Sequence, residues 1–185
     1  PPSKDSSYKA PRFQADLILI SHNHKNHNGS DTLSLKEEGG RNIVDMPGEY
    51  EIRDILIRGI QSKISGQNES GANTIFVLEL EDIRLCHMGD FSESSLSSEI
   101  KETLGEIDVL FFPIGIESLS AKTAAEIVNE IEPKIVIPMH YDATEKKNAK
   151  LEEFLNEFSQ DQIEKMDKFS IKRKDIDEEK LKVEV

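Results

Sequence analysis

The sequence predicts a layered fold of the mixed α/β (α+β) class in a single domain that spans residues 1–185. Two observations predict it. Residues 15–90 contain short apolar runs separated by polar turns, which is typical of strands, whereas residues 92–160 alternate apolar strands with amphipathic helices. The length of 185 residues fits one domain, and no repeat, low-complexity segment or linker divides the chain.

The first half of the chain is predicted to consist mainly of strands joined by turns. The run ADLILIS at residues 15–21 is short, aliphatic and polar at its end, so it predicts a fully buried strand. Ser30 or Asp31 can cap a short helix. The further elements expected here are a helix over 30–38, a strand within 39–46, two strands over 47–64 that meet near Arg53 and Asp54, a polar loop over 66–73, and strands over 73–80 and 83–90 that form a hairpin across Glu81 and Asp82.

The second half of the chain alternates helices with strands. The strands predicted at residues 107–115 and 134–141 are apolar on both faces, so layers should cover them on both sides. Apolar residues recur at helical spacing along the next predicted helix, and Pro133 ends it. The predicted helices cover residues 92–106, 120–132 and 147–160, and the tail at 169–185 is expected to add edge strands whose Lys and Glu side chains face solvent.

The composition argues against several classes of partner. The formal net charge is −13 and the pI is about 4.9, which disfavours binding to nucleic-acid phosphates and to anionic membranes. The longest apolar runs are far shorter than the ~20 residues of a transmembrane helix. Cys86 is the only cysteine and cannot form an internal disulfide, which fits a reducing compartment. We therefore expect a cytoplasmic protein that acts on a small-molecule substrate, without a nucleic-acid or membrane partner.

Three of the five histidines, His22, His24 and His27, directly follow the first predicted strand. Residues two apart in an extended chain point the same way, so His22 and His24 can converge on one point, and a turn would bring His27 beside them. Neutral imidazole is the commonest metal ligand, and zinc binds it readily. A solvated loop with incidental histidines is the alternative, but the H-x-H-x-x-H spacing favours a metal site.

Two further candidate ligands stand where other predicted strands end. Asp90 ends the strand that contains CHMGD, and His140 ends the strand that contains IPMHY. A carboxylate can bridge two metal ions, and another imidazole can complete a shell. Either residue alone could be a turn or core residue, but every candidate ligand lies where an apolar strand gives way to a loop. His87 is expected to face away from Asp90 by strand alternation, and so to pack beside the site rather than to bind metal.

Three segments together resemble the metallo-β-lactamase fold superfamily, in particular its small zinc-dependent hydrolases similar to ascorbate-phosphate lactonases. They are ADLILISHNHKNHN, GANTIFVLELEDIRLCHMGD and IDVLFFPIGIESLSAKTAAEIVNEIEPKIVIPMHY, and they cover most of residues 15–141. The resemblance implies a four-layer αβ/βα sandwich with a binuclear zinc site at one edge of its two sheets. It also implies one or two N-terminal strands upstream of residue 1.

Two positions depart from the pattern of that family. Asn26 stands where the motif H-x-H-x-D-H has an aspartate that binds the second metal, and an amide cannot act as a base. No histidine lies between His27 and His87, so the family's third imidazole on the first metal has no counterpart. The remaining metal ligands are His22, His24, His27, Asp90 and His140. We expect them to hold one zinc ion well, with Asp90 shared if a second ion binds, and we take Asp90 and Asn26 as the candidate catalytic residues.

These features leave two main hypotheses open. The first is a metal-dependent hydrolase that acts on a small ester, lactone or phosphoester, with Asn26 orienting water or substrate. The second is a pseudo-enzyme that keeps the fold, with a weak or empty metal site, to bind a small molecule or a protein. A nuclease is disfavoured by the net charge of −13.

Overall fold

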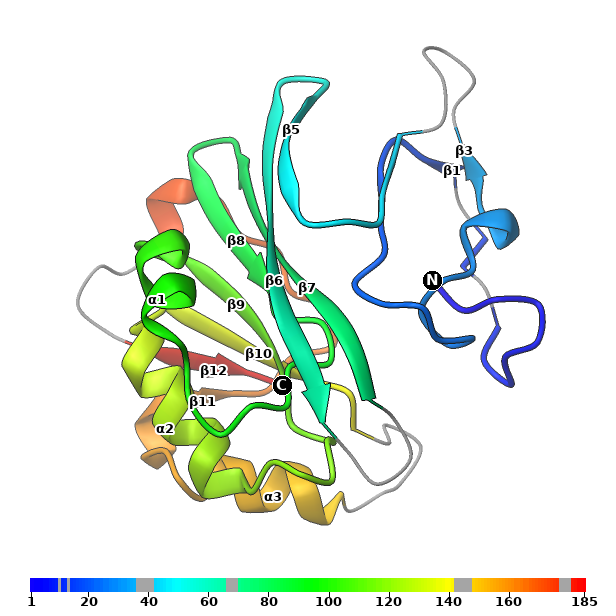
Figure 1. Ribbon diagram of the computed structural model, residues 1–185. Helices are drawn as coiled ribbons and strands as arrows, with labels where there is room; N and C mark the ends of the chain where they lie inside the picture. The colour runs from blue at the N-terminus through cyan, green and yellow to red at the C-terminus, as the bar shows by residue number, and fades with distance from the viewer. Residues whose placement is uncertain (10, 13, 36–41, 66–69, 142–147, 177–180) are drawn as a thin grey trace.

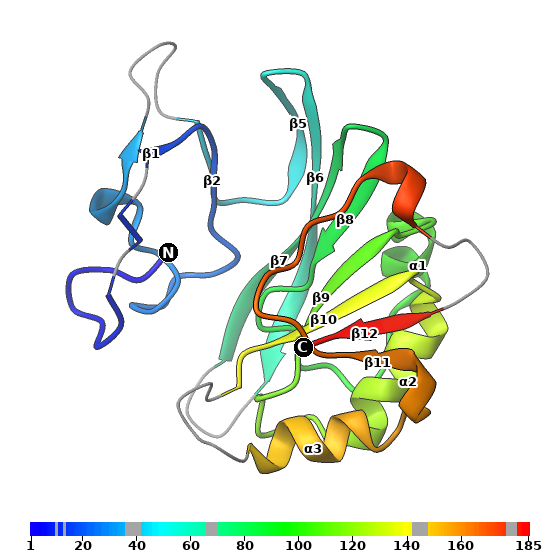
Figure 2. The same ribbon diagram turned by 180° about the vertical axis from the view of Figure 1, so that it is seen from behind.

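The computed structural model describes residues 1–185 apart from 10, 13, 36–41, 66–69, 142–147 and 177–180. Within these residues, eight strands form one mixed sheet in the order β11-β12-β10-β9-β8-β7-β6-β5. Helices α1 (Ser98–Leu104), α2 (Ala121–Ile131) and α3 (Ala149–Leu155) lie along one side of this sheet, and the N-terminal segment lies on the other (Figures 1 and 2). The predicted mixed α/β class is confirmed.

The antiparallel half of the sheet is a meander that follows chain order. It contains β5 (Gly48–Ile52), β6 (Ile55–Ser65), β7 (Ser70–Leu80) and β8 (Ile83–His87). The two-residue turns at 53–54 and 81–82 have left-handed backbones, with φ from 51° to 62°, which match the twist of paired strands. Both predicted hairpins are confirmed. The predicted loop over 66–73 is wrong for residues 70–73, which begin β7, and its other residues lie outside the described part of the chain.

The other half of the sheet is parallel. It contains β9 (Val109–Pro113), β10 (Ile135–Met139), β12 (Lys182–Glu184) and β11 (Ile163–Glu164). Because β8, β9 and β10 are parallel neighbours, their carboxyl ends share one edge of the sheet. The prediction that the tail forms edge strands is wrong for β12, which pairs with β10 and β11. Val183 is fully buried in the core, and this burial places β12 inside the sheet despite its charged flanks.

Each helix begins at a polar capping residue. The side chains of Ser97, Ser120 and Asn148 accept hydrogen bonds from the backbone N–H groups of Ile100, Thr123 and Leu151. Helices are confirmed within the three ranges predicted for the second half of the chain, but each is shorter than predicted, because it begins after a cap inside the range and ends before the last predicted residue. Their apolar faces pack on the sheet in the largest core cluster, which contains Leu110 and Phe112 of β9 and Val136 of β10.

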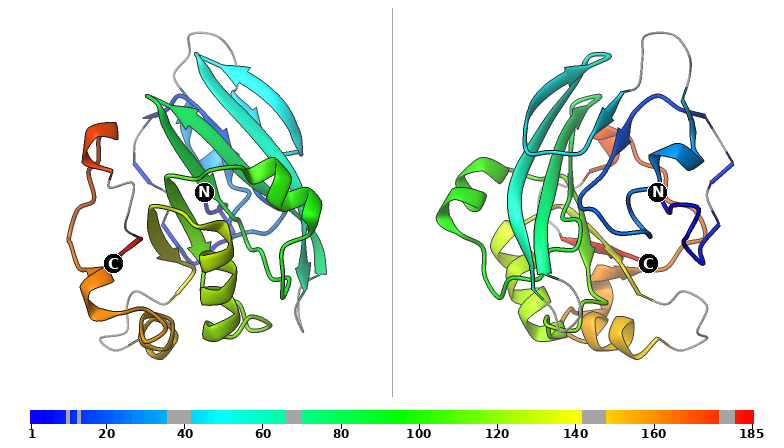
Figure 3. Two further views of the ribbon diagram at one scale, coloured as in Figure 1. Left: turned by 90° about the vertical axis from the view of Figure 1, so that its left-hand side faces the viewer. Right: turned by 45° about the vertical axis from the view of Figure 1, so that its right-hand side comes forward.

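The N-terminal segment forms two short parallel pairs in place of a continuous sheet. β1 (Gln14–Ala15) pairs with β3 (Ser34–Leu35), and β2 (Ile18–Leu19) pairs with β4 (Ile43–Val44). Val44 packs against Ile57 and Phe76 on the sheet face that the helices leave uncovered, as the right-hand view of Figure 3 shows for the segment as a whole. The helix predicted over 30–38 is wrong: a single 3-10 turn, Ser30–Thr32, leads into β3, and residues 36–38 lie outside the described part.

Two further 3-10 turns, Gln160–Gln162 and Arg173–Asp175, occur near the C-terminus. Of the four layers that the resemblance implies, the described residues supply a helix layer, the large sheet and the short N-terminal pairs. None of the described helices is both long and apolar enough to span a membrane.

Candidate metal centre

The predicted metal ligands come together at the edge where the parallel strands end. Asp90 lies three residues beyond β8, and His140 directly follows β10. The histidine segment approaches the same edge from the N-terminal side, because the Thr74 N–H of β7 donates a 2.8 Å hydrogen bond to the Ser21 carbonyl. The carboxyl ends of parallel strands are a common place for ligand sites in open α/β sheets.

A tight turn brings the three N-terminal histidines together. The His27 and Asn28 N–H groups both donate to the His24 carbonyl, at 2.8 and 2.9 Å. The ring centroids of His22 and His27 lie 4.6 Å apart, and those of His24 and His27 lie 5.7 Å apart. One nitrogen from each of the three rings can be chosen so that all lie within 4.8 Å of one another. The turn thus places His27 beside His22 and His24, which is the geometry that the spacing predicts.

Asp90 stands at the centre of the cluster. Its Oδ2 atom lies 3.3 Å from Nε2 of His22, 3.8 Å from Nε2 of His27 and 3.4 Å from Nε2 of His140. Two donors that bind a tetrahedral ion at ~2.0–2.1 Å lie roughly 3.3 Å apart, so these separations are close to those around one bound zinc ion. The side chain of Asp90 is 8% exposed, whereas that of His140 is 37% exposed and opens the cluster to solvent.

The protonation states of the cluster favour a cation. Burial lowers the pKa of His27 to about 4, so this imidazole is neutral at pH 7 with a lone pair for metal. Burial alone would raise the pKa of the Asp90 carboxyl, but the hydrogen bond from His140 and the nearby His140, His27 and His22 rings lower it overall. A buried carboxylate that stays ionised among imidazoles is the donor chemistry that zinc prefers. The residues present therefore fit a metal ion.

The described residues contain two groups of potential metal ligands, which share His27. One contains His22, His24 and His27, and the other contains His27, Asp90 and His140. The second group offers three protein ligands of the kind found in catalytic zinc sites, which leave a position open. Oδ2 of Asp90 lies close to His22 as well, so the two groups are continuous.

Asn26 and the missing histidine can both be placed in the structure. Asn26, together with His27 and His140, lines a cavity beside the cluster, and its Oδ1 accepts a 2.7 Å hydrogen bond from the Ser6 hydroxyl. Ser62, in the region of β6 where the family has a further histidine, is buried and bonded to Asn73. Neither contact adds a carboxylate or an imidazole to the cluster.

His87 lies on the opposite face of β8 from its neighbours Cys86 and Met88, as strand alternation predicts. Cys86 and Met88 are fully buried in the core under the helices. His87 lines a hollow of about 240 Å³ on the other face and stacks on Phe111, with ring centroids 6.0 Å apart. Its Nδ1 accepts a 3.0 Å hydrogen bond from the Gly89 N–H, and burial lowers its pKa to about 4. It belongs to neither group of potential metal ligands.

A cavity of about 690 Å³ opens beside the cluster and contains residues that the sequence analysis did not single out. His27, His140 and Asn26 line it on one side, and Lys9, Tyr8 and Lys150 line it on others. The Lys150 ammonium donates a 2.7 Å hydrogen bond to the Gly115 carbonyl. A Cβ at Gly115 would lie 1.5 Å from the His140 carbonyl oxygen, so only glycine allows this approach. The sequence offered one signal for Gly115. It follows a predicted strand, β9, whose carboxyl end lies at the same edge of the sheet as those of β8 and β10.

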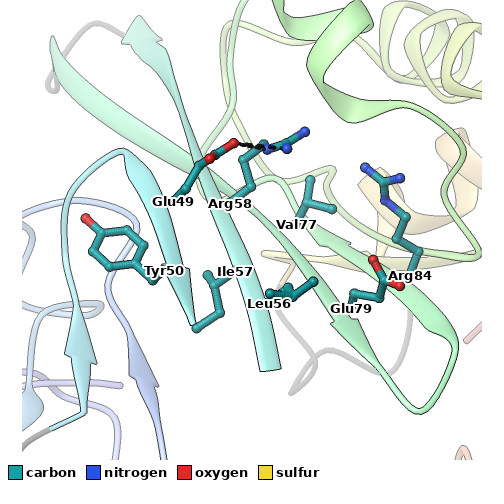
Figure 4. A pocket seen from close by; sticks show the side chains of 8 residues that line it. All are labelled: Glu49, Tyr50, Leu56, Ile57, Arg58, Val77, Glu79 and Arg84. Carbon is teal, nitrogen blue, oxygen red and sulfur yellow. Dashed lines mark hydrogen bonds and ion pairs between the residues drawn. The ribbon is translucent and has the colours of Figure 1, made fainter. Parts of the chain in front are cut away.

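A separate hollow of about 350 Å³ lies over β5 to β8, away from the histidines (Figure 4). Arg58 Nη2 lies 3.0 Å from Oε1 of Glu49 there, and Arg84 is the cross-strand partner of Glu79. Its lining contains no histidine or cysteine, and neither of the ligand groups found among the described residues includes any of its members. It is therefore not the candidate site.

Comparisons with known proteins agree with this geometry. A family model described as "Beta-lactamase superfamily domain" matches residues 1–140. A UPF0173 metal-dependent hydrolase of Thermococcus onnurineus is 29% identical over 173 residues, which cover 79% of this chain and 75% of the relative. Another of Staphylothermus marinus is 31% identical over 177 residues, which cover 83% and 73%. A solved structure from the metallo-β-lactamase superfamily of Thermotoga maritima is 29% identical, has a TM-score of 0.70, and is matched over 94% of this chain and 84% of that one.

Proposed function

This chain belongs to the metallo-β-lactamase superfamily, and from that premise we propose that it is a metal-dependent hydrolase of small anionic esters or lactones. The relatives from Thermococcus onnurineus and Staphylothermus marinus carry the description metal-dependent hydrolase, and the Thermotoga maritima structure is described as a candidate zinc-dependent hydrolase. Those descriptions belong to the relatives. The ligand cluster of this chain supports the same chemistry here.

One observation carries the proposal. The Oδ2 atom of Asp90 faces Nε2 atoms of His22, His27 and His140 at 3.3 to 3.8 Å, at the side of a cavity of about 690 Å³. A buried, ionised carboxylate is costly without a cation. The same arrangement beside an open cavity suits catalysis better than a closed structural site.

Zinc is the ion we propose, because imidazoles and a carboxylate match its preferred donors. His27, Asp90 and His140 would hold it and leave a fourth position open, whereas His22 and His24 extend the set toward a second, weaker position. When bound, zinc supplies Lewis acidity to water and to a substrate oxygen. Because Asn26 replaces an ionisable ligand and no histidine lies between His27 and His87, we propose one tightly held ion per chain.

The residues around the ion divide the remaining tasks. Asn26 lines the cavity, and its amide can hold a water or a substrate oxygen by hydrogen bonds without taking its proton. Asp90 is the one carboxylate in the two ligand groups found among the described residues, so it is the group available to hold a proton released from water. His140, which is partly exposed, joins the cluster to the cavity.

The charge of the cavity supports an anionic substrate. The chain has 36 acidic and 23 basic residues, yet the described lining of the cavity includes Lys9 and Lys150 and no Asp or Glu. The hydroxyl of Tyr8 and the amide of Asn148 add hydrogen-bonding groups to the same lining. The ammonium groups in this lining favour a phosphate or carboxylate group on the substrate. A phosphoester or a lactone with an acidic substituent fits these features better than a neutral ester.

The test combines metal content with hydrolysis. Chain stripped by chelator and dialysed against zinc should contain about one zinc by elemental analysis, and should then hydrolyse phosphate esters or acidic lactones faster than a neutral acetate ester. His140→Ala should lose zinc and activity, whereas Lys168→Ala, at an exposed position outside the cavity, should retain both. Zinc binding without hydrolysis of any class would favour the pseudo-enzyme that Asn26 and the missing histidine suggest. No zinc after soaking would contradict the proposed function.

A further inference from the structure

A buried asparagine next to the metal ligands has every hydrogen-bonding group of its side chain engaged. Asn73 is 0% exposed and lies near the start of β7. Its Nδ2 donates to the Met88 carbonyl at 2.9 Å and to the Ser62 hydroxyl at 2.8 Å, and its Oδ1 accepts from the Asp90 N–H at 3.0 Å. It belongs to neither ligand group and does not line the cavity beside the cluster.

The amide of Asn73 closes the turn that carries Asp90. Met88 and Asp90 flank Gly89, whose φ of 61° is left-handed, so one side chain bridges the two ends of this turn much as a paired strand would. A Cβ at Gly89 would lie 2.2 Å from Oδ1 of Asn73. The Gly89 N–H is held by Nδ1 of His87. The backbone of residues 88–90, which carries the Asp90 side chain, is therefore held by the Asn73 amide and by the His87 ring.

The next residue of β7 holds the other ligand segment. The Thr74 N–H donates to the Ser21 carbonyl at 2.8 Å, and Ser21 directly precedes His22. The Ser21 hydroxyl lies 3.0 Å from Nδ1 of His22, the ring nitrogen opposite the one that faces Asp90. A fixed partner on one imidazole nitrogen sets the orientation of the other toward a metal. Two adjacent residues of one strand thus hold the carboxylate turn and the histidine segment at a constant separation.

We propose that Asn73 is a positioning residue that sets the distance between Asp90 and the histidine cluster, and thereby the affinity of the site for its metal. The inference rests on the proposed metal site but not on hydrolysis. The pairing of β7 supports it, since Ser70 to Glu79, a stretch that includes Asn73, pair with β6, and Phe76 to Leu80 pair with β8 as well. Partners that orient metal ligands typically change metal affinity about 10–100-fold when they are removed.

The test compares a variant of Asn73 with a variant of Ser62, which is one of its hydrogen-bond partners. Asn73→Ala removes the bridge across the Asp90 turn, whereas Ser62→Ala removes only the third partner of that amide. Zinc affinity is measured by chelator competition, and the geometry of the site by the absorption spectrum of the cobalt-substituted protein. We expect Asn73→Ala to weaken zinc binding about 10–100-fold and to alter the cobalt spectrum, with Ser62→Ala within about threefold of the wild type and spectrally unchanged.

Each outcome decides the matter. Wild-type zinc affinity and cobalt spectrum in folded Asn73→Ala overturn the inference and leave the proposed function standing. Equal losses in both variants also overturn it, because they would show a general effect of packing. A wild-type chain that binds zinc but hydrolyses nothing contradicts only the proposed function, and one that binds no zinc contradicts both. If Asn73→Ala does not fold, Asn73→Ser, whose hydroxyl is too short to bridge the turn, is held to the same expectation.

Discussion

Two regions of the large sheet contain carboxylates in opposite circumstances, the hollow over β5 to β8 and the ligand cluster at the carboxyl ends of β8 to β10. Over β5 to β8, Glu49 is exposed and faces the guanidinium of Arg58 at 3.0 Å (Figure 4). At the carboxyl ends of β8 to β10, Asp90 is buried and faces imidazoles, of which His27 is neutral at pH 7. The first carboxylate has a permanent cation beside it. The second faces histidine nitrogens, which are potential metal ligands.

This difference shows why shape alone does not locate function. Ion pairs between exposed side chains contribute ~0–1 kcal/mol and are screened by salt, so the hollow over β5 to β8 can lose its charges at little cost. A buried carboxylate among imidazole ligands gains much more from a bound metal, because low polarity strengthens the attraction. The four predictions below test this contrast, beginning with the largest effect.

The largest effect is expected from the two carboxylates themselves. Asp90→Asn removes the charge at the centre of the cluster and should weaken zinc binding by more than about 100-fold, beyond the range for residues that only support a ligand. Glu49→Gln is the matched change in the hollow over β5 to β8 and should leave zinc affinity unaltered. Chelator competition on the two variants checks this, and equal affinities would remove the distinction between the two regions.

The metal-free protein should lose stability in acid. The pKa of His87 is about 4 in the folded chain against an ordinary value of about 6.5, so the unfolded chain takes up the proton first as the pH falls. Stability is therefore complete above about pH 6.5 and declines toward pH 4, by at most about 3 kcal/mol from this group.

His87→Phe should reduce the slope of stability against pH without abolishing it, because the pKa of His27 is lowered in the same direction. Arg58→Ala, in the hollow over β5 to β8, should keep the wild-type slope. Urea unfolding in the presence of chelator at several pH values measures these slopes. An unchanged slope in His87→Phe would show that its burial does not contribute.

A smaller effect is expected from Lys150, one of the two lysines that line the cavity. Lys150 donates to a carbonyl rather than to a carboxylate, so its charge stays available to a substrate, whereas Arg58 is already paired with Glu49. Lys150→Ala should raise KM for a phosphate ester about tenfold and leave kcat and neutral esters nearly unchanged, with partial recovery in Lys150→Arg. Lys122→Ala, on the exposed face of α2, is the control. Equal KM changes for charged and neutral esters would contradict the anionic substrate.

The smallest effect concerns the ion pair in the hollow over β5 to β8. A double-mutant cycle on Glu49 and Arg58 should give a coupling energy below about 1 kcal/mol that falls further in high salt, because both side chains are substantially exposed. Urea unfolding of the two single variants and the double variant measures it. A coupling of several kcal/mol would mean that the charges in this hollow interact as strongly as buried charges do.

Local patterns in the sequence were sufficient for most elements. Apolar runs, polar caps and the turns at 53–54 and 81–82 involve neighbours in the chain, so they predict the meander, the helices and the placement of candidate ligands at strand ends. They failed where long-range pairing overrides local character. Residues 70–73 are polar and glycine-bearing, yet they pair with β6, and β12 is flanked by charges yet lies between two strands.

The sequence by itself determined which side chains could bind a metal, because His22, His24 and His27 are close in the chain and Asp90 and His140 follow apolar strands. Only the tertiary structure decided that they meet, since the parallel order of β8, β9 and β10 brings Asp90 and His140 to one edge across 50 residues of chain. It also decided the roles of Asn73, Lys150 and Gly115. A single asparagine, lysine or glycine has no periodicity to reveal it, and its role arises from contacts between segments that are distant in the chain.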